Sequence, residues 1–172
     1  MAEPKDLSRN RAAPYRDVDH RLDTRTPLYP ANAVAAIVLV DDKYLLQLRD
    51  SKRGIFFPMH WGCFGGAAEP GETCKRALVR ELREELAIAL EPTSLRYFSR
   101  FDFDLSFAGL APIWRYFYEI VLAAPCFADL RLGEGSAMRL FSAHEILTAT
   151  FPMTPYDAFA LWCHINRGRL RA

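Results

Sequence analysis

The stretch that decides the fold is Gly66–Ile88, with the sequence GAAEPGETCKRALVRELREELAI. A glycine-rich turn leads here into a helical segment that carries clustered carboxylates. Residues three and four apart are neighbours on a helix, so Glu81, Glu84 and Glu85 are expected to face one patch. A like-charge pair four apart, such as Glu81 and Glu85, destabilises a helix by about 0.2–0.5 kcal/mol. Helix stability therefore does not explain the cluster, whereas a bound divalent cation does.

The turn before the helix has a sequence that fixes its geometry. In Glu69–Glu72, proline and glycine occupy the two central positions expected of a type II turn, because proline presets φ and glycine accepts positive φ. Thr73 can then cap the helix, and Glu72 lies near the positive end of its dipole. We expect a helix over Thr73–Leu86, in which Arg80 pairs with Glu84. An apolar stripe holds this helix to the core: Leu78, Val79, Leu82 and Leu86.

The sequence on either side alternates between strand-like and helix-like segments and contains no internal repeat. The apolar, β-branched run Ala33–Val40 predicts a buried strand. The stretch Leu95–Phe107 alternates between apolar and polar residues and predicts one strand of a long hairpin. Further elements are expected as follows: strands at Tyr44–Arg49, Ile113–Leu122 and Arg139–Phe141, a short helix capped by Ser142 and Glu145, and a final helix from Thr154 to about Gly168. Together these segments predict a mixed α+β fold.

Length and composition exclude several classes of protein. The chain has 172 residues, of which 51% are hydrophobic, and a net charge of +1. This predicts one globular domain without the basic excess of a protein that binds long nucleic acid or an anionic membrane. The longest apolar run, Ala33–Val40, is too short to span a bilayer. Four cysteines without a Cys-x-x-Cys pattern indicate neither a zinc site nor a disulfide framework, and the first thirty residues contain no apolar targeting segment. We therefore expect a cytoplasmic protein.

The domain is expected to occupy residues 31–172, after a polar arm over residues 1–30. The arm interleaves basic and acidic residues, which is typical of a flexible leader. A second interpretation is that Tyr15 and Tyr29 let it pack across the partner in a dimer. The sequence favours the flexible leader. The apolar composition and the length of the arm nevertheless lead us to expect a homodimer.

The spacing of the glycine turn and its helix resembles the signature box of the Nudix hydrolases. In order it has Gly66, Glu72 after five residues, and, after seven more, the run Arg80-Glu81-Leu82-x-Glu84-Glu85-x-x-Ile88. Ala87 stands where the family signature has glycine. That glycine serves the end of the helix, where the left-handed conformation costs alanine about 1 kcal/mol. The departure affects helix termination and leaves the carboxylates intact.

The resemblance implies an α/β/α sandwich with a mixed central sheet that hydrolyses a nucleoside diphosphate linked to another group, using Mg²⁺ or Mn²⁺. It implies that Glu81, Glu84, Glu85 and the carbonyl of Gly65 hold the metal. Such cations prefer oxygen ligands and bind through a few carboxylates plus substrate phosphates. Supporting roles fall to Gly66, whose backbone can approach an ion or phosphate closely, to Glu72, which can contact the metal through water, and to Arg80, which orients the glutamates.

The substrate class and the possibility of a noncatalytic protein stay open at this point. Small nucleoside diphosphate derivatives fit the weak net charge, and we favour nucleotide sugars or nucleoside triphosphates. The alternative is a noncatalytic Nudix-like module that binds a nucleotide or a partner protein. A helix of alternating arginine and glutamate is often only a solvated surface. The glycine turn upstream and the intact carboxylates favour the enzyme, with Glu84 and Glu85 acting in catalysis.

Residues outside the Gly66–Ile88 box are candidates for the remaining roles. Glu134, in a glycine-rich loop, is our candidate for a general base or an extra metal ligand, although it can also be a solvated loop residue. Glu119 is the weaker alternative, since a buried salt bridge to Arg115 explains it equally well.

Arg49 and Arg115 are predicted to clamp substrate phosphates, unless they form surface ion pairs. Four aromatic residues can stack a base or belong to the core: Phe56, Phe57, Trp61 and Tyr116. Of the four histidines, only His60, beside the glycine turn, is a candidate for a functional role.

Overall fold

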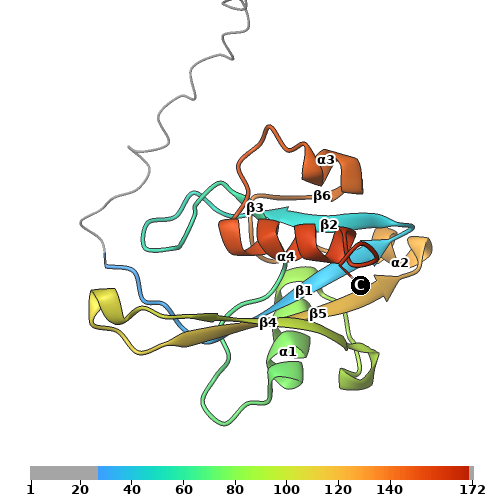
Figure 1. The fold of residues 1–172 in the computed structure, drawn as a ribbon. Coiled ribbons are helices and arrows are strands. Elements are labelled where there is room, and N and C mark those ends of the chain that lie inside the picture. Colours follow the sequence, from blue (N-terminus) through green and yellow to red (C-terminus); the bar gives the residue numbers. More distant parts are fainter. Residues whose placement is uncertain (1–26, 171–172) are drawn as a thin grey trace, which may run out of the picture.

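A mixed six-stranded sheet forms the centre of the protein (Figure 1). The computed structural model describes residues 27–170, so most of the predicted arm lies outside the described residues. The strand order is β3-β2-β1-β5-β4, and β6 pairs with β2. β1 and β5 are parallel, whereas the other pairs are antiparallel. The strands are β1 (Ala33–Val40), β2 (Lys43–Leu48), β3 (Trp61–Gly62), β4 (Arg96–Phe103), β5 (Ile113–Leu122) and β6 (Ala137–Phe141).

Helices cover both faces of this sheet. One face packs against α1 (Cys74–Leu86), through a core that includes Leu78 and Leu82. The other face packs against α3 (Ala143–Leu147) and α4 (Pro155–Ile165). A further short helix, α2 (Ala124–Asp129), follows β5. The predicted α/β/α sandwich with a mixed sheet is therefore confirmed. None of the helices in residues 27–170 is long and apolar enough to cross a membrane.

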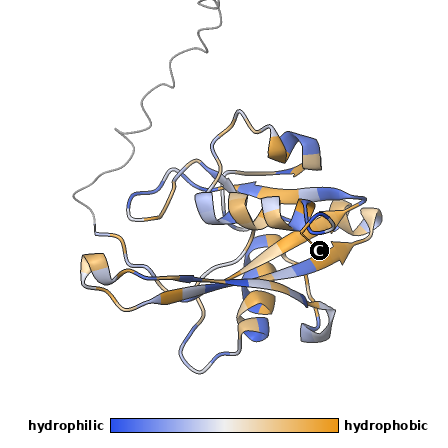
Figure 2. Cartoon of the chain, viewed as in Figure 1, coloured by the Kyte–Doolittle hydropathy of each residue, from blue (hydrophilic) through white to orange (hydrophobic). Residues whose placement is uncertain are grey.

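β1 is the central strand, and its sequence explains why. Val34 and Ala36 pack into the core beneath α1, whereas Ala35 and Ile37 pack into the core beneath α4. A strand with partners on both faces needs an apolar residue at every position rather than at alternate ones. Figure 2 accordingly shows β1 as an almost continuous hydrophobic strand and α1 as alternating hydrophobic and hydrophilic turns.

Most of the predicted elements are present, and their differences have local causes. Thr73 caps α1, because its hydroxyl accepts a hydrogen bond from the Arg76 N–H at 3.4 Å. The predicted capping box of Ser142 and Glu145 is also present. The prediction of one strand over Leu95–Phe107 was wrong at its end. The Asp104 carboxylate accepts from the Ser106 N–H at 2.9 Å, and this local turn replaces strand pairing beyond Phe103.

The end of α1 has the geometry expected from the family signature despite its alanine. Ala87 adopts the left-handed conformation with φ of 55°, and its N–H donates to the Arg83 carbonyl at 3.1 Å. An alanine side chain makes this conformation less favourable than glycine does. The fold therefore retains the helix end at a small cost in stability.

Candidate functional site

Two glycines let the chain pass between β1 and α1. Gly65 has φ of +126°, and a Cβ atom on it would lie 2.3 Å from the carbonyl oxygen of Val34. A Cβ atom on Gly66 would lie 2.7 Å from the carboxylate of Glu81. A larger residue at Gly65 would therefore clash with β1, and one at Gly66 would clash with the acidic helix. The close approach explains on steric grounds why the turn needs both glycines.

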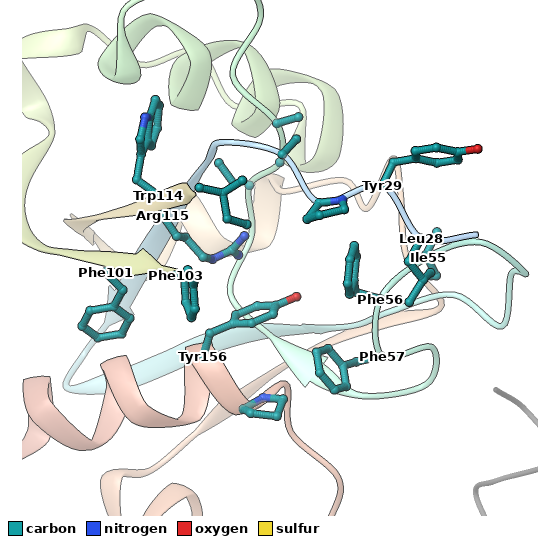
Figure 3. Close-up of a pocket in the computed structure, with 18 of the residues that line it drawn as sticks. Leu28, Tyr29, Ile55, Phe56, Phe57, Phe101, Phe103, Trp114, Arg115 and Tyr156 are labelled. Atoms are coloured by element: carbon teal, nitrogen blue, oxygen red, sulfur yellow. The ribbon is translucent and has the colours of Figure 1, made fainter. Parts of the chain in front are cut away.

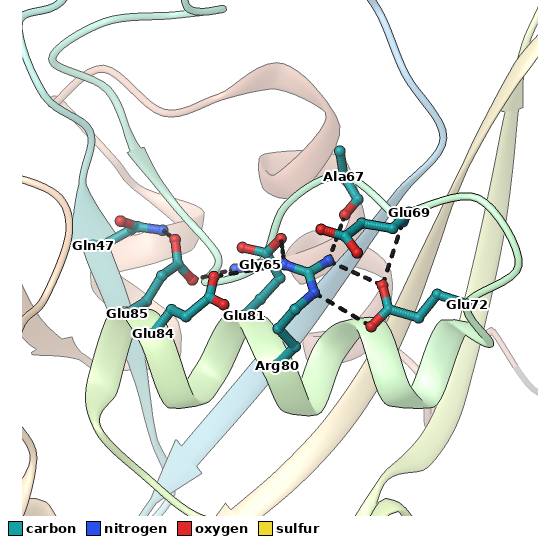
Figure 4. Close-up of polar contacts among 9 residues, drawn as sticks. All are labelled: Gln47, Gly65, Ala67, Glu69, Glu72, Arg80, Glu81, Glu84 and Glu85. Atoms are coloured by element: carbon teal, nitrogen blue, oxygen red, sulfur yellow. Dashed lines mark hydrogen bonds and ion pairs between the residues drawn. The ribbon is translucent and has the colours of Figure 1, made fainter.

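Glu85 is the most deeply buried carboxylate of the acidic helix, with 4% of the residue exposed. It accepts hydrogen bonds from the Gly65 N–H at 2.6 Å and from the Gln47 side-chain amide at 2.9 Å (Figure 4). Burial raises the pKa of Glu85 to about 7, although both hydrogen bonds act in the opposite direction. Burial also raises the pKa of Glu81, against the effect of the neighbouring Arg80.

Arg80 connects the acidic helix to the glycine turn. Its guanidinium donates to Glu81 at 2.7 Å, to Glu72 at 3.0 Å and to the carbonyl of Ala67 at 3.0 Å (Figure 4). The predicted pair with Glu84 is longer, at 3.5 Å. These contacts join Arg80 to the carboxylates of Glu81 and Glu72, and its role in orienting metal ligands stays a prediction.

A cavity of about 1190 Å³ extends from this acidic helix. Glu81, Glu85 and the backbone of Gly65 and Gly66 line one end, together with Glu134 from the loop before β6. We call this the acidic end. Lys52 contacts Glu134, with 3.5 Å between its Nζ atom and the carboxylate. The structure thus brings the predicted loop glutamate to the helix carboxylates, which are distant from it in sequence.

Glu84 differs from its two neighbours. Its side chain is 56% exposed and it is not among the described residues that line the cavity. It lies on the same side of α1 as Glu81 and Glu85, one turn from Glu81 (Figure 4). Of the three predicted helix ligands, the structure places Glu81 and Glu85 on the cavity wall and Glu84 beside it.

Aromatic side chains form the other end of the cavity, which we call the aromatic end (Figure 3). Its rings come from the loop after β2, from β4, and from α4. Leu28, Tyr29 and Pro30, which belong to the predicted arm, also line the cavity. These rings are Phe56, Phe57, Phe101, Phe103 and Tyr156.

Both arginines that were predicted to bind substrate line the cavity. The Nε atom of Arg49 donates to the Phe56 carbonyl at 2.9 Å. Arg115 comes from β5, on the face covered by α4, and its Nη2 atom lies 3.2 Å from the carboxylate of Asp157. Its guanidinium lies over the ring of Tyr156, with 4.6 Å between Cζ and the ring centroid. Asp157 and the ring therefore fix the position of Arg115.

The structure corrects the interpretation of Glu119. The predicted salt bridge to Arg115 is wrong, because Glu119 pairs with Arg96, Arg167 and His164. Its Oε2 atom lies 2.6 Å from the ring of His164. Glu119 is not among the described residues that line the cavity. It belongs to a charge network in which Glu119 and His164 are buried and Arg96 and Arg167 are exposed.

Three other candidates also lie outside the set of described residues that line the cavity. Trp61 packs edge-on against Phe141, with ring centroids 4.9 Å apart, in the core beneath α4. Tyr116 is oriented toward the α1 face and stacks on Tyr118. The ring of His60 interacts with the Pro58 carbonyl at 2.8 Å. Of the four predicted aromatic stacking residues, only Phe56 and Phe57 reach the cavity.

Gln47 is a site residue that was not predicted from the sequence. It is 3% exposed and holds the Glu85 carboxylate from β2. The available signal was a lone amide in the otherwise apolar run Tyr44–Leu48. A buried amide needs partners, but only the fold shows that the partner is Glu85.

The donors at the acidic end are compatible with a hard divalent cation. Among residues 27–170, no group of three or more His, Cys, Asp or Glu side chains is arranged so that it could hold a metal ion. The candidate donors are nevertheless all oxygen atoms, from carboxylates and a backbone carbonyl, which Mg²⁺ and Mn²⁺ prefer. The charge on Glu81 raises the pKa of the buried Glu85 further, so a cation would relieve their repulsion.

Sequence comparison places the chain among known proteins. The model of the NUDIX domain matches residues 30–161. The nucleoside triphosphatase NudI of Enterobacter sp. (strain 638) is 46% identical over 63 residues, which is 37% of this chain and 44% of NudI. Its Escherichia coli namesake is 42% identical over 62 residues, or 36% of this chain and 43% of that protein. The matched segment thus spans less than half the length of these curated relatives.

Solved structures share the fold. The Escherichia coli ORF135 protein has a TM-score of 0.61 at 27% identity, covering 84% of this chain and 96% of that one. The MutT protein from Methanosarcina mazei Go1 has a TM-score of 0.65 at 19% identity, covering 82% and 96%. The NUDIX domain of Shewanella oneidensis NrtR, solved with ADP ribose, has a TM-score of 0.61 at 17% identity, covering 90% and 97%. Because the domain model matches most of the sequence, this chain belongs to the Nudix hydrolase family.

Proposed function

We propose that this protein hydrolyses a pyrophosphate bond in a nucleoside diphosphate linked to another group, with Mg²⁺ or Mn²⁺ as cofactor. The observation that carries the proposal is the convergence of Glu81, Glu85 and Glu134 at one end of a cavity whose other end is aromatic. Acidic oxygen donors suit a cation with phosphates, and aromatic walls suit a nucleobase. Nucleoside triphosphates are the leading substrates, because NudI carries that name, and nucleotide sugars are the second class.

The acidic end supplies the groups that this reaction needs. Glu81, Glu84, Glu85 and the carbonyl of Gly65 would hold the metal, which when bound lowers the pKa of a water and neutralises phosphate charge. Arg80 fixes the Glu81 carboxylate through a hydrogen bond of 2.7 Å. Gln47 and the backbone of Gly65 fix Glu85. Such outer partners hold ligands in one orientation and thereby support the site.

Proton transfer and phosphate binding are assigned to residues on the cavity wall. Glu134 is our proposed general base, because it faces the acidic end from a separate loop. Lys52 keeps its carboxylate near that end through an ion pair of 3.5 Å. Arg49 binds substrate phosphates with the guanidinium nitrogens that remain after Nε donates to Phe56.

The test is a product assay on purified protein. Nucleoside triphosphates and nucleotide sugars are incubated with Mg²⁺ or Mn²⁺, and products are identified by mass. We expect hydrolysis by the wild type and a loss of at least about 100-fold in Glu84→Gln and Glu85→Gln. Glu91→Gln is the matched control, because Glu91 is an exposed glutamate after α1 that does not line the cavity. Equal product in all variants, or none in any, would contradict hydrolysis at this site. Nucleotide binding without turnover would instead favour the noncatalytic module.

We further propose a cytoplasmic location, a homodimer, and an N-terminal arm outside the domain of residues 31–172. The cysteines Cys63, Cys74, Cys126 and Cys163 are free, which is compatible with a reducing compartment. A monomeric mass at micromolar concentration would contradict the dimer. Comparing the masses of the full chain and a variant without residues 1–26 would separate the contribution of the arm to dimerisation from that of the domain.

A further inference from the structure

Arg115 is a cation fixed within an otherwise aromatic end of the cavity. Its side chain is 11% exposed. The guanidinium carbon lies 4.6 Å from the ring centroid of Tyr156 and 5.5 Å from that of Phe117. Figure 3 shows the guanidinium near the ring of Tyr156 and directed into the cavity. A ligand at this end would therefore meet a positioned hydrogen-bond donor.

The hydrogen-bonding capacity of Arg115 is largely unused. Nη2 lies 3.2 Å from Oδ1 of Asp157, but Oδ1 has no partner in hydrogen-bond geometry. The Nε atom has no hydrogen-bond partner either. Since buried donors without acceptors are costly, a ligand acceptor that reaches this guanidinium gains a favourable contact. The ion pair with Asp157 therefore sets the position of Arg115 but leaves hydrogen-bond donors of its guanidinium without acceptors.

Rings near Arg115 offer flat surfaces for an aromatic ligand. Tyr156 and Phe57 form an edge contact with centroids 5.7 Å apart, and Phe56 lies next to Phe57 at 6.5 Å. All three line the cavity. Stacking on such rings contributes about 1–3 kcal/mol per base and does not depend on the identity of the base. Discrimination between bases must therefore come from polar groups.

Few polar groups are available to read the edge of a base. The described residues that line the cavity include no Asn, Ser, Thr or His, and their only side-chain amide, Gln47, donates to Glu85. The carboxylates of Asp50 and Asp102 are paired with Lys52 and Arg100. Arg115 has donors to spare at the aromatic end, and the other such groups are the tyrosine hydroxyls, the indole N–H of Trp114 and the nitrogens of Arg49 that are assigned to phosphates.

A guanidinium only donates, and this restricts the bases that it can recognise. Exocyclic carbonyl oxygens of bases accept from arginine, whereas the exocyclic group of adenine is an amino group that donates, so adenine offers a guanidinium only its ring nitrogens. We infer that Arg115 selects nucleotides whose base carries an exocyclic carbonyl and disfavours adenine nucleotides. This inference rests on the proposed function, because it places a nucleobase in the aromatic end.

The test compares inosine and adenosine monophosphates, which present a 6-oxo group and a 6-amino group on the same purine frame. Calorimetric titration of the full chain is expected to show IMP binding about tenfold more tightly than AMP, from a discrimination of about 1–3 kcal/mol. Equal binding, tighter binding of AMP, or binding of neither would overturn the inference.

A double variant assigns the preference to Arg115. Loss of Arg115 alone would leave the buried Asp157 without its counter-ion, so Arg115→Met is combined with Asp157→Asn. An asparagine oxygen can still accept from the Cys63 N–H and the Thr154 hydroxyl, which now bind Oδ2 of Asp157. The IMP-to-AMP ratio is expected to fall to near one in this variant, and a retained ratio would overturn the inference. Because the nucleotides are monophosphates, this outcome is independent of hydrolysis, which tests the proposed function separately.

Discussion

The carboxylate of Glu85 accepts a hydrogen bond from the backbone N–H of Gly65 at 2.6 Å, which joins α1 directly to the glycine turn 20 residues earlier. This contact makes the turn and the helix one structural unit. The glycine provides both the close approach and the donor, and the helix provides the acceptor. A second donor, Gln47, reaches the same carboxylate from β2 at 2.9 Å. Three separate segments therefore define the position of one buried acid.

Replacing Gln47 by methionine tests whether it positions Glu85. The change removes a donor that lowers the pKa of Glu85, so that pKa should rise above its value of about 7. We expect a loss of roughly 10–100-fold in turnover or metal affinity, as for other partners of metal ligands. The acid limb of the pH–rate profile should move to higher pH. A profile that coincides with that of the wild type, in a variant with normal thermal unfolding, would exclude this role.

Glu134 and Glu119 can be distinguished by substitution. Glu134 lines the cavity, and Glu134→Gln is expected to lower turnover by about 100-fold or more if it acts as the base. Glu119 is bound to Arg96, Arg167 and His164, so Glu119→Gln should lower the stability of the fold. The turnover of the folded variant should stay within about twofold of the wild type, because Glu119 does not line the cavity. Steady-state rates and thermal melts of both variants provide the comparison. The reverse pattern would identify Glu119 as the base.

Acid should destabilise the fold through the buried pair of Glu119 and His164. Burial alone would raise the pKa of Glu119, but hydrogen bonds from His164 and Arg167 hold it below its ordinary value of 4.5. Burial lowers the pKa of His164 below 6.5, although its hydrogen bond to Glu119 opposes that shift. Both groups therefore bind more protons in the unfolded chain, so stability falls as pH falls below about 6.5 and falls further below about 4.5.

Melting temperatures between pH 8 and pH 4 measure this dependence. The groups that face the pair are Tyr44, Arg96 and Arg167, and the two arginines keep their charge throughout this range. In Glu119→Gln, the decrease below pH 4.5 should be smaller than in the wild type. A melting temperature that rises on acidification from pH 6.5 to pH 5 would contradict the assignment.

Ala87→Gly should stabilise the protein without affecting the site. Glycine removes the cost of a left-handed alanine, about 1–2 kcal/mol, and adds about 0.4–1 kcal/mol of unfolded-chain entropy. We expect a net gain of about 0.5–1 kcal/mol, seen as a rise of about 1–4 °C in melting temperature. Ala89→Gly is the control, because Ala89 is exposed and has no positive φ. A gain in the control, or a loss at Ala87, would show that backbone strain is not the cause.

The sequence predicts the fold well where a local pattern and a tertiary contact require the same residues. β1 is apolar at every position because both of its faces are covered, and α1 carries its cap, its apolar stripe and its acids within one short segment. The end of β4 was not predicted, because alternation continues beyond Phe103 while the Asp104 side chain already accepts from the N–H of Ser106. Periodicity does not reveal that competition.

The site was predictable to the extent that it lies within one segment. Glu81 and Glu85 follow from the Gly66–Ile88 box, whereas Gln47 depends on β2 passing beside α1. Trp61 was a reasonable stacking candidate by type, but the short strand β3 directs it toward Phe141. The partner of Arg115 was misassigned because Asp157 comes from α4, more than forty residues later in the chain. Contacts between segments that are distant in the sequence can be assigned only once the fold is known.

The most direct test of the account is the rate of nucleoside triphosphate hydrolysis in ¹⁸O-labelled water with Mg²⁺, for the wild type and Glu85→Gln. We expect cleavage of a pyrophosphate bond in the wild type, with one ¹⁸O atom in one product. We also expect a loss of at least about 100-fold in the variant. Unlabelled products, or equal rates for both proteins, would contradict the claim that the carboxylates of α1 form a hydrolytic site.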